Sequence, residues 1–161
     1  MSERPSRADK TIFIASSSFD EPTWSPVAQS LADRGYNVVA YEADKVADGT
    51  TSLEVRVSQD EGLNVRYDNC DLALTEVGAA WFRRPTMFSE ELEDRAFMLS
   101  LDTERALTQN SLWEAVPASA WLNQPARMRR AEHKLTQLVV ALEVGFVIPP
   151  DTVVTLSLIH I

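Results

Sequence analysis

Short apolar runs alternate with amphipathic segments along the first part of the chain, and this alternation restricts it to few folds. Residues 11–16 form an apolar run typical of a buried parallel strand. A helix is expected next, capped at Thr23 or Ser25 and closed by Gly35, and residues 37–41 form a second apolar run. Strand, helix and strand in this order predict an α/β sheet with parallel strands.

After the second strand, the residue pattern changes from that of parallel strands joined by a helix to that of an antiparallel hairpin. Residues 52–57 and 63–67 alternate apolar and polar side chains around a turn, which predicts two antiparallel strands. Residues 77–83 predict a further strand, and residues 90–113 a long helix with an acidic first turn. We therefore predict an open mixed α/β sheet, a Rossmann-like domain with the hairpin at one edge and the long helix across a face.

The glycines exclude a dinucleotide-binding site. None lies in the turn after the first strand, where a pyrophosphate needs close approach of the backbone. The serines at 16–18 could offer hydroxyls to a phosphate, but a hydrogen-bonded turn is the simpler interpretation. Glu42 and Asp44 follow the second strand at the place of a ribose-binding acid, and without the glycine loop they are most simply solvated loop charges.

Composition excludes several other classes of function. The formal net charge of -9 argues against nucleic acid or an anionic membrane as partner, and no apolar run approaches the roughly 20 residues of a membrane helix. With only His133 and His160, no histidine zinc site or Ser-His-Asp triad is expected, so we predict no metal site. The single cysteine, Cys70, cannot form an intrachain disulfide, which favours the cytoplasm.

Arg83 and Arg84 are the first candidate site, for a substrate or an anion. They follow Trp81 and Phe82 and precede Pro85 at the carboxyl end of a strand, the edge where open α/β sheets bind ligands. Strand alternation places the two arginines on opposite faces unless the strand has already ended. An equally good interpretation is that they pair with the acids between residues 90 and 94.

Residues 121–155 hold the second candidate. They predict a strand, a helix begun by Pro125 and stopped by Gly145, and a new strand. One apolar stripe is expected on that helix, with Lys134 about 100° around the axis from Leu135, beside the packed face. The stripe consists of Ala131, Leu135, Leu138, Val139 and Leu142. An ordinary amphipathic helix with a solvent-facing lysine is the alternative.

The joint pattern resembles a known family. Trp-Phe-Arg-Arg-Pro, a long acidic helix, Trp-Leu-Asn-x-Pro, Arg-Ala-x-x-Lys-x-x-Gln-Leu and Gly-Phe-x-Ile-Pro together resemble the N-terminal part of the ATP-grasp ribosomal peptide maturases, the microviridin-type (graspetide) macrocyclising ligases. The resemblance spans about residues 11–155 and is most specific from Trp81 onward. His133 stands where the family usually has asparagine, and Pro149-Pro150 lengthens the last motif by one residue.

The resemblance implies a function. Such ligases use ATP and Mg²⁺ to phosphorylate side-chain carboxylates of a precursor peptide, and an amine or hydroxyl then attacks the acyl phosphate to form an amide or ester cross-link. Lys134 matches a lysine that contacts the ATP phosphates at the start of such a helix. The Mg²⁺ ligands and a second phosphate-binding lysine lie beyond Thr155 in the family pattern, so we expect no catalytic residue here and no activity of this fragment alone. The resemblance does not decide between a monomer and a homodimer.

The expected organisation has four parts. Residues 1–10 read as a disordered lead-in, residues 11–124 as the pre-ATP-grasp domain, and residues 125–155 as a linker helix and the first strand of a truncated ATP-grasp domain. Residues 156–161 match the translation of a transposon adapter end used in sequencing libraries, so we expect an adapter-derived tail. Two other functions stay open: a non-catalytic α/β module that binds a peptide or subunit, and a RimK-like or glutathione-synthetase-like ATP-grasp ligase.

Overall fold

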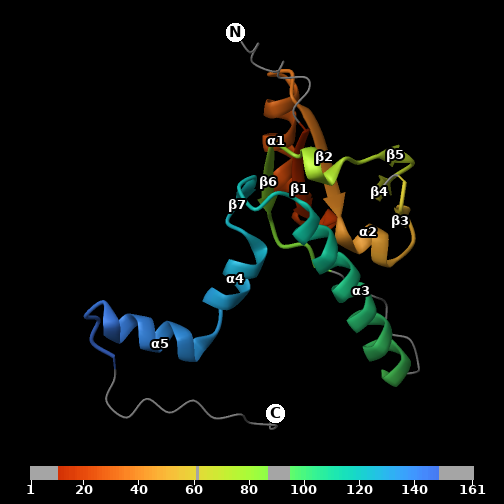
Figure 1. Cartoon of the computed structure of the whole chain (residues 1–161). Helices are drawn as coiled ribbons and strands as arrows, with labels where there is room; N and C mark the ends of the chain where they lie inside the picture. Colours follow the sequence, from red (N-terminus) through yellow and green to blue (C-terminus); the bar gives the residue numbers. More distant parts are fainter. Residues whose placement is uncertain (1–10, 61, 87–94, 149–161) are drawn as a thin grey trace. The chain divides into compact units, whose positions relative to one another are not determined.

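The computed structural model describes residues 11–60, 62–86 and 95–148, with the backbone alone for residues 95–99. It divides the chain into two units, Met1–Leu122 and Asn123–Ile161, whose helices and strands are labelled in Figure 1. The lead-in, the strand expected after residue 150 and the tail at 156–161 lie outside the described residues. No helix in the described part is long and apolar enough to cross a membrane.

A parallel sheet of four strands organises the first unit, in the order β2-β1-β6-β7. The strands are β1 (Thr11–Ser16), β2 (Asn37–Glu42), β6 (Ala79–Phe82) and β7 (Trp121–Leu122). Because β1 lies between β2 and β6, its Phe13, Ile14 and Ala15 are at most 1% exposed. The predicted α/β class and the buried parallel strand are therefore confirmed.

An aromatic core covers one face of this sheet. Alternation along β1 turns Phe13 and Ala15 to the same face, where they meet Leu112 and Trp113 of helix α3 (Arg95–Ala115) and Val116, which directly follows it. The rings pack at tilted and edge-on angles with centroids 5.2–6.3 Å apart, the favourable range for aromatic pairs. Burial raises the pKa of the Tyr41 hydroxyl, so this side chain stays neutral.

Helix α1 (Glu21–Ala32) packs against β1 and β2. None of its residues belongs to the aromatic core, so it covers the opposite face, the one toward which Ile14 turns. The helix begins about one turn earlier than expected, because Pro22 fits the first turn, where its missing N–H costs no hydrogen bond. Gly35 follows the helix with φ +83°, as a glycine stop requires.

The predicted hairpin forms, but it does not join the parallel sheet. Strands β3 (Leu53–Ser58) and β4 (Gly62–Tyr67) pair antiparallel, and β5 (Cys70–Asp71) extends them into a separate three-stranded sheet. The expectation of a hairpin at the edge of one mixed sheet is wrong in this respect. The short helix α2 (Ala43–Ala47) separates β2 from β3. The hairpin meets β2 through the Tyr67 side chain, whose hydroxyl accepts from the Glu42 backbone N–H at 3.0 Å.

The second unit contains two helices where we predicted one. Helix α4 (Pro125–Ala131) ends before His133, whose ψ of 112° is extended, and α5 (Lys134–Glu143) begins immediately after it. The break is held by Gln137, whose side-chain amide donates to the Ala131 carbonyl at 2.6 Å and so satisfies a carbonyl at the end of α4. The predicted glycine stop is confirmed at Gly145, with φ +85°.

Candidate functional site

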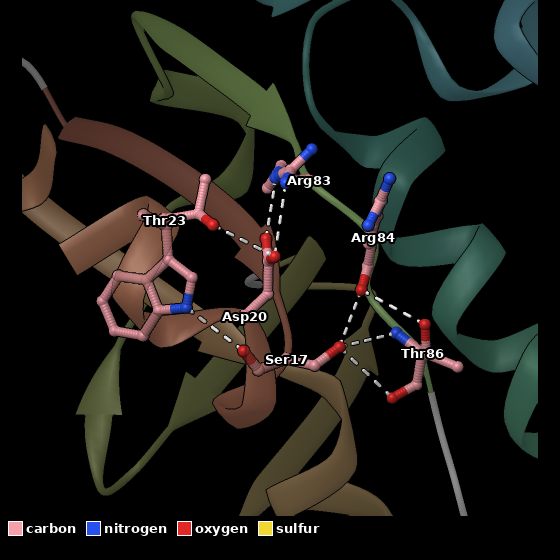
Figure 2. A network of polar contacts seen from close by, with 7 residues as sticks. Ser17, Asp20, Thr23, Arg83, Arg84 and Thr86 are labelled. Atoms are coloured by element: carbon pink, nitrogen blue, oxygen red, sulfur yellow. Dashed lines mark hydrogen bonds and ion pairs between the residues drawn. The ribbon is translucent and has the colours of Figure 1, made fainter.

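The carboxyl ends of β1 and β6 bring the first candidate site together. Since the two strands are parallel neighbours, the residues that follow them emerge at the same edge of the sheet. Ser17 follows β1, and Arg83 and Arg84 follow β6. Figure 2 shows these residues with Asp20, Thr23 and Thr86 in one network of polar contacts.

Arg83 is held in a two-point ion pair. Its Nε donates to Asp20 Oδ2 at 2.7 Å and its Nη2 to Asp20 Oδ1 at 3.3 Å, and both side chains are mostly buried. Thr23 adds a hydroxyl donor to the same carboxylate at 3.3 Å. The partner of Arg83 thus comes from the 3-10 helix after β1 (Ser18–Asp20), while the acids at 90–94 that we considered lie outside the described residues. Arg83 is a structural residue in this arrangement.

Arg84 adopts a backbone conformation that is unfavourable for an arginine. Its φ is +46°, in the left-handed region, which costs a non-glycine residue about 1–2 kcal/mol. The buried Ser17 hydroxyl donates to the Arg84 carbonyl at 2.7 Å and accepts from the Thr86 N–H at 2.8 Å. One serine therefore fixes the backbone on both sides of Pro85 and holds Arg84 in its strained turn.

The Arg84 side chain is exposed, and its guanidinium has no hydrogen-bond or ion-pair partner among the residues that the structure describes. Because β6 ends at Phe82, strand alternation no longer decides where the arginines point. Figure 2 shows the Arg84 side chain extending away from the Ser17 hydroxyl that binds its carbonyl. A free guanidinium at this edge suits bidentate binding of a carboxylate or phosphate.

The serines after β1 are engaged in the fold. Besides Ser17, the Ser18 N–H donates to Asp44 Oδ1 at 2.8 Å and its hydroxyl bonds the other oxygen of that carboxylate. Ser16, the last residue of β1, is the exception: it is fully buried, and its hydroxyl has no hydrogen-bond partner among the described residues. The interpretation of this segment as a hydrogen-bonded turn agrees with these contacts. Asp44 is not the solvated loop charge that we expected, and Glu42 is bonded to Lys45 at 2.7 Å.

Lys134, the candidate phosphate-binding residue, is the first residue of α5. Its side chain is exposed, and its Nζ lies 3.3 Å from the Gln137 side-chain oxygen. The structure brings Arg83 and Arg84 to one sheet edge, whereas Lys134 belongs to the second unit. A lysine at the first position of a helix fits the place that the family resemblance gave it, although our residue pattern had placed it inside a longer helix.

The apolar stripe beside Lys134 differs from expectation. Ala131 lies on α4, so the break removes it from the stripe. On α5, Leu135, Val139 and Leu142 are 63%, 54% and 55% exposed, and no residue of that helix is buried. Lys134 therefore does not border a packed face within the described residues.

Sequence reasoning did not foresee the contacts that Asp20, Ser17 and Thr86 make in the network. Asp20 carried a weak signal, since an aspartate shortly before a proline-started helix is a common cap. The serines at 16–18 indicate a hydrogen-bonded turn, but not the contact between Ser17 and Thr86. These two residues are 69 positions apart, and only the register of β1 against β6 brings them into contact.

Comparison with known proteins places this fold in a family. Residues 11–129 match the model of the MvdD pre-ATP grasp domain. The solved macrocyclase MdnB from Microcystis aeruginosa MRC is 24% identical with a TM-score of 0.72, over 88% of this chain and 46% of that one. MdnC from the same organism, bound with precursor peptide MdnA, is 23% identical with a TM-score of 0.68, over 86% and 45%.

A third likeness is the RiPP-associated ATP-grasp ligase of Chryseobacterium gregarium, in complex with ADP and a leader and core peptide. It is 22% identical with a TM-score of 0.63, over 87% of this chain and 43% of that one. These likenesses show the fold, and the chain spans less than half the length of each solved chain. No curated protein matches. Since the family model covers most of the sequence, the chain belongs to the MvdD pre-ATP grasp domain family.

Proposed function

We propose that this chain is the N-terminal part of an ATP-dependent ligase that cross-links a precursor peptide through its side-chain carboxylates. The observation that carries the proposal is the family match over residues 11–129. The same fold in macrocyclases and in ligases solved with precursor peptides and nucleotides supports it. We place the enzyme in the cytoplasm, where the exposed thiol of Cys70 would stay reduced.

The proposed reaction has two steps. A side-chain carboxylate oxygen of the precursor attacks the γ-phosphorus of ATP, which forms an acyl phosphate and releases ADP. An amine or hydroxyl of the same peptide then attacks the acyl carbon, the C–O bond to phosphate breaks, and a proton and inorganic phosphate leave. Each cross-link thus removes one water from the peptide and consumes one ATP.

Two side chains of this chain have proposed roles. Lys134 would bind the ATP phosphates, because a lysine at a helix start supplies a localised charge where negative charge develops. Arg84 would bind a carboxylate of the precursor, because its guanidinium is exposed and its backbone is fixed by Ser17. The described residues contain no group of acidic, histidine or cysteine side chains that could hold a metal ion, so we assign no Mg²⁺ ligand to them.

The test uses the complete ligase encoded by the gene, incubated with ATP, Mg²⁺ and a precursor peptide encoded nearby. We expect ADP release that depends on the peptide, loss of one water per cross-link by mass spectrometry, and a hydroxamate on the peptide when hydroxylamine intercepts the acyl phosphate. The 161-residue chain is the matched control and should release no ADP. Peptide binding without ADP release by the complete protein would favour the non-catalytic module.

A further inference from the structure

A hollow in the first unit lies apart from the sheet edge with Arg84. It has a volume of about 210 Å³ and lies between α2, the start of β3 and the middle of α3. Its apolar wall consists of Tyr41, Val46, Ala47 and Leu53, and its polar wall of Glu104, Arg105, Thr108 and Gln109. None of these residues takes part in the network around Ser17.

The volume of the hollow restricts its occupant. Pockets for cofactors and other small-molecule ligands usually measure about 300–1,000 Å³, so this one is too small for a nucleotide. It is large enough for one big apolar side chain. The tyrosine ring and the three aliphatic side chains of the apolar wall would surround such a group and remove it from water.

The polar wall holds two donors that make no hydrogen bond within the part of the chain that the structure describes. Gln109 is 7% exposed, and its Nε2 has no acceptor among the described residues. Arg105 donates from Nη2 to the Ala47 carbonyl at 2.7 Å, whereas its buried Nη1 has only a loose ion pair with Asp102 at 3.7 Å. Rotation of the terminal Gln109 torsion toward an acceptor in the hollow would satisfy an atom whose isolation destabilises the fold.

The charges at the hollow favour a neutral acceptor over an anion. Asp102 lies beside Arg105 and offsets its charge, and the exposed Glu104 adds a second negative group to the wall. A carboxylate would therefore meet net repulsion, whereas a main-chain carbonyl would not. An apolar side chain next to a carbonyl acceptor is the chemistry of a peptide segment.

We propose that this hollow binds a peptide segment, with one leucine- or phenylalanine-sized side chain inside and a main-chain carbonyl accepting from Gln109. The assignment of that segment to the precursor peptide rests on the proposed function, whereas peptide binding itself does not. The contact would anchor the peptide on the first unit, through residues that take no part in the network around Arg84.

The test titrates the isotope-labelled chain with N-acetyl-leucine N-methylamide and follows backbone amide shifts. We expect shifts at Ala47, Leu53 and Thr108, and binding about tenfold or more weaker for the glycine analogue, which lacks the apolar side chain. The glutamate analogue should also bind more weakly. Absence of shifts with the leucine probe, or tighter binding of the glutamate probe, would overturn the proposal.

Three variants separate binding from folding. Thr108→Trp should fill the mouth of the hollow and abolish the shifts, while Leu107→Trp, at an exposed position of the same helix outside the lining, should preserve them. Gln109→Met removes the donor that lacks a hydrogen bond, so it should raise the melting temperature. Because it also removes the proposed contact to the carbonyl, it should weaken binding of the leucine probe. Unchanged affinity of Gln109→Met would refute the carbonyl contact. If the chain binds the leucine probe but the complete protein shows no ligase activity, this inference stands and the proposed function is rejected.

Discussion

The two units use their apolar residues in opposite ways. In the first unit, the large apolar side chains of β1, β2, β6 and α3 meet in one aromatic core. In the second unit, α5 is also rich in apolar side chains, yet its Leu135, Val139 and Leu142 are all more than half exposed. The contrast teaches that the first unit supplies its own hydrophobic stabilisation, whereas α5 presents an apolar surface that the described residues of its own unit do not cover.

Trp113→Ala should produce the largest loss of stability. The indole is 4% exposed and contacts the rings of Phe13, Tyr41, Phe82 and Trp121. Removing it should lower the free energy of unfolding by about 3–5 kcal/mol, as for other buried aromatic residues. Urea unfolding followed by circular dichroism measures this loss. Leu107→Ala on the same helix is the control, and an equal loss there would mean that the core is not where we place it.

Asp20→Ala should have the next largest effect. It leaves the mostly buried Arg83 guanidinium without its two-point partner, which should cost about 2 kcal/mol. A double-mutant cycle with Arg83→Ala measures the coupling by urea unfolding. If the losses of the two single variants add up to the loss of the double variant, the interaction between the two side chains contributes nothing to stability.

Arg84→Gly should stabilise the first unit while it removes the anion site. Glycine adopts φ +46° without strain, so we expect a gain of about 1 kcal/mol in the free energy of unfolding. Ser17→Ala should do the opposite to stability, because it removes the hydroxyl that bonds Arg84 and Thr86. Thermal unfolding of both variants measures the sign of each change in stability. Destabilisation by Arg84→Gly would mean that the side chain has a structural partner.

Val139→Ser should have the smallest effect. This side chain is 54% exposed, so the substitution should change the free energy of unfolding by less than about 0.5 kcal/mol. Chemical denaturation of the 161-residue chain tests this. A loss above about 1 kcal/mol, the size expected when a buried methyl group is removed, would show that α5 is covered. The two units would then not differ in how they use their apolar residues.

Local patterns predicted those parts of the fold that local physics determines. The apolar run at β1, the alternation in β3 and β4 and the glycine after α1 each specify their element by periodicity or backbone freedom. The separation of the two sheets could not be predicted in this way, because the hairpin meets the rest of the first unit through tertiary contacts, such as the hydrogen bond from the Glu42 backbone N–H to the Tyr67 hydroxyl.

The candidate site was predictable to a similar degree. The position of Arg83 and Arg84 at a strand end follows from sequence, but their different roles do not. Asp20, 63 positions away, engages Arg83, and Ser17 fixes Arg84 through contacts that depend on tertiary register. The break at His133 was missed because apolar spacing continues across it, while the bond from Gln137 to Ala131 that holds it is not visible in periodicity.

The ATP turnover of Lys134→Ala in the complete ligase tests the central claim most directly. If Lys134 binds the ATP phosphates, turnover should fall by about 100-fold or more, with partial recovery in Lys134→Arg, because a planar guanidinium replaces a compact ammonium poorly. Lys45→Ala, which removes a lysine bonded to Glu42 in the first unit, should leave turnover within a few-fold. Full activity and unchanged ATP affinity of Lys134→Ala would contradict the account and favour the non-catalytic module.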